Sequence, residues 1–284
     1  MPGSVLPVVT RFAPSPTGHL HLGHAHAALF GWRTARAAGG QFLLRIEDID
    51  TGRCRPVFET DLIEDLRWLG LDWDGPIRRQ SAHFDDYRAA RAQLEALGLL
   101  YRCFCTRRDV AAEIGEAAQA PHGLAGSLYP GRCRTLSPAE SDDRAAAGHP
   151  FAWRLDARRA LALTGPLTWT DRLAGTQSVC PETLGDVVLA RKDTPTSYHL
   201  SVTVDDAIQG VTLVTRGVDL FHATAIHRLL QALLALPVPQ WHHHPLLTDD
   251  QGRRLAKRDG ARSLRALRAT GLSPAQVRAL AGMT

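Results

Sequence analysis

The sequence lacks an apolar run of the ~18 residues that a membrane-spanning helix requires. Its beginning also lacks the basic segment and following apolar stretch of a secretory signal. It contains no internal repeat and no long low-complexity tract. These absences argue against a membrane span and a repeat array, and they predict a cytoplasmic protein with no membrane partner.

A large excess of charge of one sign is also missing. The formal net charge is +4 over 284 residues, with 22% charged and 44% hydrophobic residues, as is usual for a soluble globular protein. This length allows two small domains with a sizeable core. The charge is compatible with a nucleic-acid partner but does not require one.

Basic residues gather near the end of the chain. Between positions 253 and 268, seven of them accompany a single acid, Asp259: Arg253, Arg254, Lys257, Arg258, Arg262, Arg265 and Arg268. This stretch is either a solvated helix face or an edge that contacts phosphate groups.

The five cysteines are odd in number, and three of them, at 103, 105 and 133, form a loose cluster in the sequence. In a cytoplasmic chain, clustered cysteines indicate a metal site before disulfides. Cys54 and Cys180 match no such site, and we expect both to be free thiols.

Residues 11–24 are the most informative segment of the chain. An apolar strand ends near Phe12, prolines and a glycine then interrupt it, and a helix is predicted over 22–38, before Gly39 and Gly40. The start of such a helix presents free N–H groups and the positive end of its dipole, which is suited to phosphate. His21 and His24 lie there one turn apart, so both can reach the same anion.

The residues that follow alternate strands and helices. We expect a strand over 41–46, a helix from Pro56 that ends before Gly70, and a helix over about 81–97. This alternation predicts an α/β fold with a mostly parallel sheet covered by helices.

The pattern loosens between about 101 and 181. This segment contains a capping-box helix start at 137–140 and short strand-like runs at 151–155 and 167–170, and we interpret it as an insertion. The alternation resumes with segments at 186–191, 197–206 and 210–214 and a helix over about 220–236. The expected units are 1–100 and 186–240 as two halves of one domain, 101–185 as the insertion, and 241–284 as a basic C-terminal region.

The string HLGH at 21–24 resembles the HIGH signature of class I aminoacyl-tRNA synthetases, and RFAPSPTGHLHLG at 11–23 resembles the glutamyl/glutaminyl branch. The resemblance implies a Rossmann-like catalytic domain with an inserted α+β acceptor-type subdomain and a short C-terminal KMSKS-loop region. It also implies ATP, accompanied by Mg²⁺, as a ligand of His21, Gly23 and His24.

The second half of the ATP site is implied by RLAKR at 254–258, which resembles the KMSKS loop. Lys257 falls at the position of the phosphate-contacting lysine, and Arg254 replaces a lysine that also serves ATP. Ala256 replaces the usual serine and removes a hydroxyl donor. Without the resemblance, the string is equally consistent with a solvated basic loop.

The resemblance also implies a glutamate site. Its residues would be Arg11, Phe12, Ala13, Pro14, Ser15, Glu47, Tyr198 and Arg216, the last two within a stretch similar to YHLANVVDD…GVTHVIRG. Glu47 would pair with the α-amino group of the substrate, and Arg11 suits a carboxylate because its guanidinium binds bidentately. The alternatives are an acidic loop for Glu47, core packing for Tyr198 and a surface position for Arg216.

The cysteine cluster, with Tyr129 four residues before Cys133, resembles the zinc site of glutamyl-queuosine tRNA(Asp) synthetases. Tetrahedral Zn²⁺ takes four N, S or O donors, and Cys103, Cys105, Cys133 and Tyr129 would supply them. His122 or a water could replace the tyrosine, and three reduced structural cysteines are the alternative without metal. The run at 242–244 is not expected to bind one ion, because adjacent histidines on an extended chain point to opposite faces.

Fewer than thirty residues follow Arg258, so we expect no anticodon-binding domain. The resemblance then implies tRNA-independent activation of L-glutamate by ATP and its transfer to the queuosine base in the anticodon of tRNA(Asp). The alternatives are a compact or truncated glutamyl-tRNA synthetase that charges the 3′ end, and a non-catalytic amino-acid- or RNA-binding relative. We expect a monomer.

Overall fold

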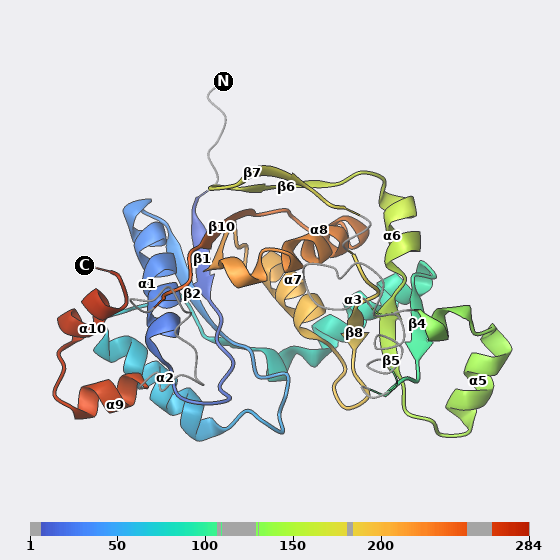
Figure 1. Ribbon diagram of the computed structural model, residues 1–284, viewed down its shortest axis with the longest axis horizontal. Coiled ribbons are helices and arrows are strands. Elements are labelled where there is room, and N and C mark those ends of the chain that lie inside the picture. Colours follow the sequence, from blue (N-terminus) through green and yellow to red (C-terminus); the bar gives the residue numbers. More distant parts are fainter. Residues whose placement is uncertain are drawn as a thin grey trace.

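The structure is a computed structural model that describes residues 7–106, 109, 129, 131–180, 184–248 and 263–283. Within these ranges, strands form three sheets flanked by helices (Figure 1). The described helices include none that is both long and apolar enough to cross a membrane.

The first sheet has the order β1-β2-β3 and is parallel throughout. Its strands are β1 (Val9–Phe12), β2 (Gln41–Ile46) and β3 (Arg78–Arg79), and α1 (Leu22–Ala37) connects the first two. The helices α2 (Pro56–Trp68) and α3 (Phe84–Ala96) follow, the second directly after η1 (Gln80–His83). The predicted parallel α/β arrangement is thus confirmed, and α1 ends within one residue of its expected limit.

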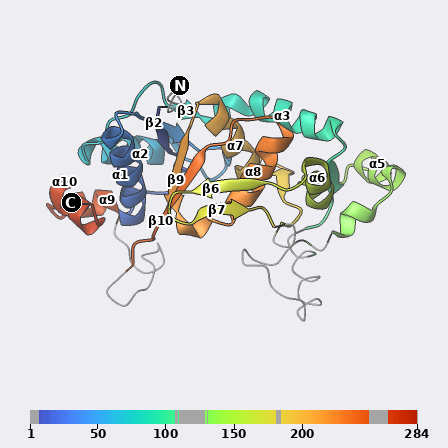
Figure 2. The same ribbon diagram turned by 90° about the horizontal axis from the view of Figure 1, so that it is seen from above.

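The second sheet has the order β7-β6-β10-β9. Its strands are β6 (Thr168–Asp171), β7 (Gly175–Ser178), β9 (Leu213–Gly217) and β10 (Gln240–His244), and only the β6–β7 hairpin is antiparallel. The helices α7 (Tyr198–Ile208) and α8 (Ala223–Leu233) pack beside it, with η4 (Val218–Leu220) between β9 and α8 (Figure 2). β6 and β7 lie in the segment expected as an insertion, yet β6 pairs with β10, a strand that spans the expected limit at 240.

The first two sheets meet along β1 and β9. The backbone N–H of Thr212 donates to the carbonyl of Val9 at 3.0 Å, and the amide of Val9 donates to the Thr212 hydroxyl at 2.9 Å. Residues about two hundred positions apart therefore lie side by side. This junction brings the carboxyl ends of β1 and β9 together, where parallel α/β folds bind ligands.

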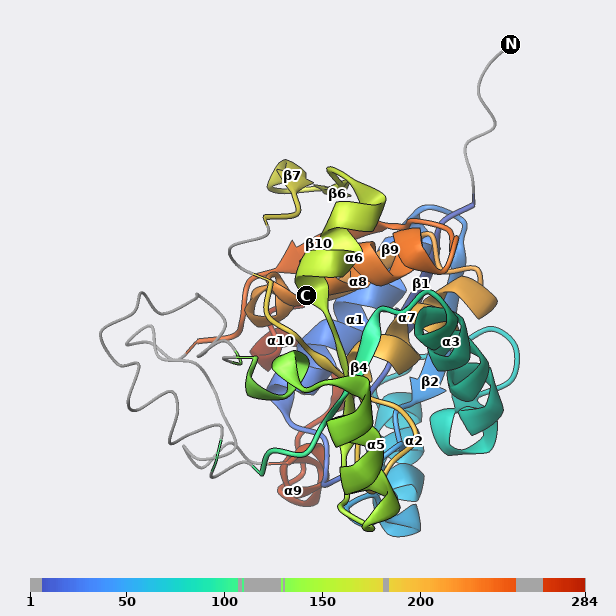
Figure 3. The same ribbon diagram turned by 90° about the vertical axis from the view of Figure 1, so that its right-hand side faces the viewer.

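The third sheet is antiparallel, with the order β4-β5-β8. It consists of β4 (Leu100–Cys103), β5 (Ala152–Leu155) and β8 (Val188–Ala190), and it is accompanied by η2 (Arg132–Thr135), α5 (Pro138–Ala146) and α6 (Ala157–Thr164) (Figure 3). The predicted capping box at the start of α5 is confirmed, since Ser137 and Glu140 cap each other's backbone N–H groups.

Two apolar clusters support these layers. One lies between α1, α2 and the terminal helices α9 (Leu264–Ala269) and α10 (Pro274–Leu280), and the other surrounds α3, α7 and α8. Gly31 lets α1 approach β9 closely, because a Cβ there would lie 2.8 Å from the Thr215 hydroxyl. The start of α1 is thereby fixed next to the ends of β9 and β10.

Candidate active site and metal site

Two histidines cap the start of α1. Nδ1 of His21 accepts a hydrogen bond from the backbone of Gly23 at 3.1 Å, and Nδ1 of His24 accepts one from the backbone of His21 at 3.2 Å. The two rings lie 3.9 Å apart, centroid to centroid. Because each Nδ1 accepts, the neutral form of each ring carries its proton on Nε2, as a donor suited to an anion.

A pocket opens at this point between the start of α1 and the ends of β9 and β10. Its lining is His21, Gly23, His24, His26, Ala27, Gly217, Asp219, His244, Leu246 and Leu247. A Cβ on Gly217 would lie 2.5 Å from an Asp219 carboxylate oxygen, so any other residue at this strand end would displace the Asp219 side chain. Lys257 and Arg254 lie outside the described residues, but Ser263, just beyond them in sequence, forms a β-bridge with His21.

A buried ion-pair network occupies the ends of β1 and β2. Arg11 binds Asp206 bidentately, at 2.9 and 3.3 Å, and Arg45 donates to the same carboxylate at 2.8 Å. Although burial alone would raise the pKa of Asp206, the two guanidinium groups hold that pKa below its usual value. Sequence reasoning missed Arg45 and Asp206, although Arg45 is two residues before Glu47 and Asp206 is eight residues after Tyr198.

Glu47 belongs to the same network. Its carboxylate lies 3.2 Å from Nη2 of Arg45, and its backbone N–H donates to the carbonyl of Pro14 at 2.9 Å. Burial raises the pKa of Glu47, while Arg45 and Arg11 act in the opposite direction. The turn at residues 11–15 therefore runs directly beside this carboxylate, with Phe12 and Pro14 buried, Ala13 half-buried and Ser15 exposed.

Tyr198, at the start of α7, and Arg216, near the end of β9, face each other at 3.3 Å. Burial raises the pKa of Tyr198, and the positive charge of Arg216 opposes this rise. Arg216 is only 6% exposed, which makes the alternative of a surface arginine wrong. The Arg11 guanidinium also donates to the carbonyl of Thr215, the neighbour of Arg216, at 3.2 Å. The two groups of side chains therefore adjoin, and together they offer the carboxylate and guanidinium groups that a zwitterionic ligand requires.

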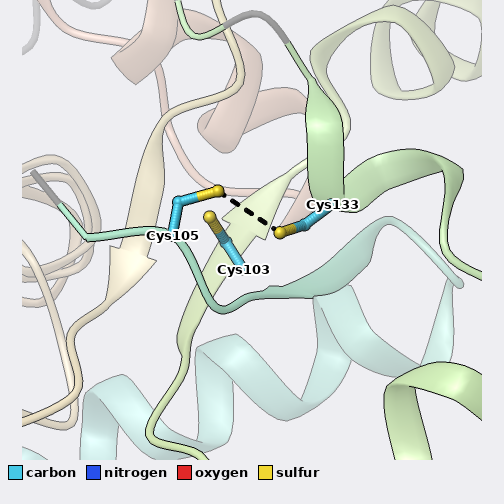
Figure 4. A group of neighbouring side chains, drawn as sticks. All are labelled: Cys103, Cys105 and Cys133. Carbon is cyan, nitrogen blue, oxygen red and sulfur yellow. Dashed lines mark hydrogen bonds between the residues drawn. The ribbon is translucent and has the colours of Figure 1, made fainter. Parts of the chain in front are cut away.

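The three clustered cysteines converge at the end of β4 and in η2 (Figure 4). The sulfurs of Cys103, Cys105 and Cys133 all lie within 4.8 Å of one another, and those of Cys105 and Cys133 are 3.4 Å apart. The Tyr129 hydroxyl lies 3.4 Å from the sulfurs of both Cys103 and Cys105. His122 lies outside the described residues.

These distances fit one tetrahedral ion. A Zn–S bond of about 2.3 Å and a Zn–O bond of about 2.0 Å place neighbouring donors roughly 3.5–3.8 Å apart. The guanidinium of Arg154 lies 3.8 Å from the centre of the Tyr129 ring, where a cation favours a phenolic oxygen of increased negative charge. The three cysteine sulfurs can therefore hold a metal ion together.

The fold and the helix-start histidines define a class I synthetase catalytic domain, and comparisons with known proteins agree. The family of class I tRNA synthetases (E and Q), catalytic domain, matches residues 7–282. A glutamate tRNA ligase from Elizabethkingia meningosepticum superimposes with a TM-score of 0.76 at 32% identity, over 89% of this chain and 52% of that structure. The chain thus spans about half the length of that ligase.

Relatives of similar length are named glutamyl-Q tRNA(Asp) synthetase. The protein of Rhodobacter capsulatus is 52% identical over 282 residues, covering 97% of this chain and 100% of the relative. That of Nocardia farcinica is 48% identical, covering 95% of this chain and 82% of the relative. The chain belongs to the class I tRNA synthetases (E and Q), in the branch of the glutamyl-Q tRNA(Asp) synthetases.

Proposed function

We propose that the protein activates L-glutamate with ATP, without tRNA, and transfers it to the queuosine base in the anticodon of tRNA(Asp). The observation that carries this proposal is the match to a glutamyl-Q tRNA(Asp) synthetase over that relative's whole length. Glutamate–tRNA ligases match too, but the chain covers only 56% of the one from Acidithiobacillus ferrooxidans. Charging of the tRNA 3′ end is therefore the second candidate.

In the activation step, a carboxylate oxygen of glutamate bonds to the α-phosphorus of ATP, and the bond to the β-phosphate oxygen breaks to release pyrophosphate. The protein must align the reactants and balance phosphate charge. His21 and His24 suit this role, because both line the pocket at the start of α1 and carry the proton of the neutral ring on Nε2. Lys257 and Arg254 would close on the phosphates from the other side, and Mg²⁺ bound with ATP would offset further negative charge.

Glutamate would lie in the space between Arg11, Glu47, Tyr198 and Arg216. Glu47 would accept hydrogen bonds from the α-ammonium group. Arg216 and the Tyr198 hydroxyl would donate to a carboxylate, because the hydroxyl oxygen already accepts from Arg216 and its own proton remains for a ligand. Arg11, held bidentately by Asp206, would contribute positive charge at the wall of the pocket.

A basic and aromatic surface beside the site suits an unpaired RNA loop. A pocket there is lined by Arg88, Arg91, Ala145, Gly148, His149, Pro150, Phe151, Trp153, Ala190, Arg191, Lys192 and Pro195. Arg191 also reaches Asp50, three residues beyond Glu47, at 3.5 Å, so this pocket adjoins the amino-acid site. Unpaired bases stack on aromatic rings while basic groups contact phosphates. An anticodon loop has both features.

The cysteine site would hold one structural zinc ion. It lies in η2 and at the end of β4, which also carries Arg102, and it would fix these segments relative to each other. We further propose that the protein is cytoplasmic and acts as a monomer.

The decisive experiment measures two reactions of the purified protein. The first is glutamate-dependent exchange of labelled pyrophosphate into ATP without tRNA. The second is transfer of labelled glutamate to an anticodon stem-loop of tRNA(Asp), prepared with and without queuosine. We expect exchange, and label on the modified stem-loop alone. Transfer that requires an intact 3′ end would favour the second candidate, and absence of exchange would favour a non-catalytic relative or a tRNA-dependent synthetase.

A further inference from the structure

Arg216 is surrounded by uncharged acceptors. Its Nε donates to Nε2 of His243 at 3.1 Å and its Nη2 donates to the Thr224 hydroxyl at 2.6 Å. Its Nη1 lies 3.3 Å from both the Tyr198 hydroxyl and Nδ1 of His227. Among the described residues, no carboxylate forms an ion pair with this guanidinium.

His243 is held in the neutral form that accepts from Arg216. Its Nδ1 lies 2.8 Å from an oxygen of Asp171, whose other oxygen accepts the backbone N–H groups of Leu173 and Ala174. A carboxylate can only accept, so Nδ1 keeps the proton and Nε2 offers its lone pair. Burial and the charge of Arg216 together lower the pKa of His243 to about 4, against the effect of Asp171. The ring is therefore neutral at pH 7.

His227 is also neutral, because it is buried next to Arg216. Its Nδ1 faces the guanidinium of Arg216, so its proton lies on Nε2, which donates to Nδ1 of His199 at 3.3 Å. Burial lowers the pKa of His227 well below its usual value, and it lowers the pKa of His199 to about 4. The His227 and His243 rings therefore orient Arg216 without cancelling its charge.

The other charges of the pocket match one another. Arg11 and Arg45 face Asp206 and Glu47, two arginines against two carboxylates. Arg216 is left as one unmatched positive charge, and it is only 6% exposed. A buried charge without a counter-ion is costly, so the ligand has to supply the negative charge.

Asp205, next to this network, does not supply the negative charge that Arg216 lacks. Its carboxylate accepts from Arg78 at 2.7 Å, from Gln80 at 2.8 Å and from the Tyr87 hydroxyl at 2.9 Å. It is fully buried among these donors and also lies 3.7 Å from Nε of Arg45, and among the described residues it forms no ion pair with Arg216. The pocket therefore keeps its excess of one positive charge.

Glutamate carries two carboxylates and one ammonium group near neutral pH, whereas glutamine has one of each. We propose that His227 and His243 determine specificity as positioning residues: they hold Arg216 through neutral nitrogen atoms, so that the pocket accepts glutamate, with its net negative charge, and rejects uncharged glutamine. The inference rests on the proposed activation of glutamate and names how that same site selects it.

A matched pair of variants tests this role. In His227→Asn, the amide oxygen can replace Nδ1 as a neutral acceptor, whereas His227→Asp has the same shape with a negative charge next to Arg216. We expect the Asn variant to keep the KM for glutamate within about threefold. We expect the Asp variant to raise it about tenfold or more, the order of one lost charge-assisted interaction. The Asp variant should change kcat by a smaller factor than the KM for glutamate, and it should leave the KM for glutamine unchanged.

Pyrophosphate exchange without tRNA gives KM and kcat for both amino acids, and calorimetry of glutamate binding gives a second readout that does not depend on catalysis. His243→Gln and His243→Glu form a second matched pair in case His227→Asp does not fold. Equal glutamate-to-glutamine preference in the neutral and charged variants, with normal exchange by the wild-type protein, would overturn the specificity role alone. A wild-type protein without glutamate-dependent exchange would refute the proposed function as well.

Discussion

Replacing Asp206 with asparagine should destabilise the protein far more than its one lost charge suggests. This carboxylate binds Arg11 and Arg45 at 2.9 and 2.8 Å, and Arg45 has no exposed surface. In Asp206→Asn, Arg11 loses its ion-pair partner among the described residues, and Arg45 keeps only Glu47 at 3.2 Å and Asp205 at 3.7 Å. Removal of one partner from a buried ion pair costs about 3–5 kcal/mol of unfolding free energy. That is a large part of the roughly 5–15 kcal/mol that stabilises a folded domain.

Urea unfolding at pH 7, followed by circular dichroism, measures this loss. Asp193→Asn is the matched control, because Asp193 pairs with Arg191 at 3.1 Å but is 67% exposed on its side chain. The control should lose about 0–1 kcal/mol of unfolding free energy. A loss of that same small size for Asp206→Asn would refute the conclusion that Asp206 balances the buried arginines.

Acid should reduce the difference between wild type and Asp206→Asn. The folded-state pKa of Asp206 is lowered, so its stabilising contribution is complete above its unfolded pKa, ordinarily about 3.9. The contribution disappears as the pH falls through the folded-state pKa. The Asn variant lacks this contribution, so the unfolding free energies of wild type and variant should converge below about pH 4. A constant difference across that range would contradict the conclusion that the ionised Asp206 carboxylate stabilises the protein.

Four further variants and one control, Cys180→Ser, test the remaining parts of the site. Cys133→Ser should abolish stoichiometric zinc and lower the melting temperature, whereas Cys180→Ser, at an exposed thiol, should do neither in metal analysis and thermal unfolding. Gly217→Ala should raise the KM for ATP, because its Cβ would lie 2.5 Å from an Asp219 oxygen; an unchanged KM would separate this strand end from the ATP site. Trp153→Ala should weaken transfer to the stem-loop about tenfold, by loss of ~1–3 kcal/mol of stacking, without affecting pyrophosphate exchange. Lys257→Ala should slow exchange by ~10²-fold or more if this lysine stabilises phosphate charge, and unchanged exchange would remove that role.

Local sequence signals predicted much of the fold. The helix from Leu22, the strand Gln41–Ile46 and the capping box at Ser137 depend on residues within a few positions of one another, and all three are confirmed. The histidine-bearing helix start and the cysteine cluster could be singled out for the same reason: each lies in a short, recognisable string.

Long-range pairings could not be predicted in this way. Arg45 and Asp206 are separated by 161 positions, and no periodicity relates a buried arginine to a distant carboxylate. His227 and His243 were equally hidden, because their importance comes from a shared contact with Arg216 and not from their spacing. The addition of β6 and β7 to β10 likewise depends on tertiary packing, which strand propensity does not encode.

The junction of β1 with β9 has a consequence for synthesis. A ribosome delivers Arg11 and Arg45 long before residue 206, so in the nascent N-terminal half both cations lack their shared carboxylate, and only Arg45 has a nearby acid, Glu47. Burial of those cations is unfavourable until Asp206 is made. The carbonyl of Val9 in β1 also lacks its donor, the backbone N–H of Thr212, until that residue is made. Completion of the proposed glutamate site is therefore a late event of folding, which follows translation of about three quarters of the chain.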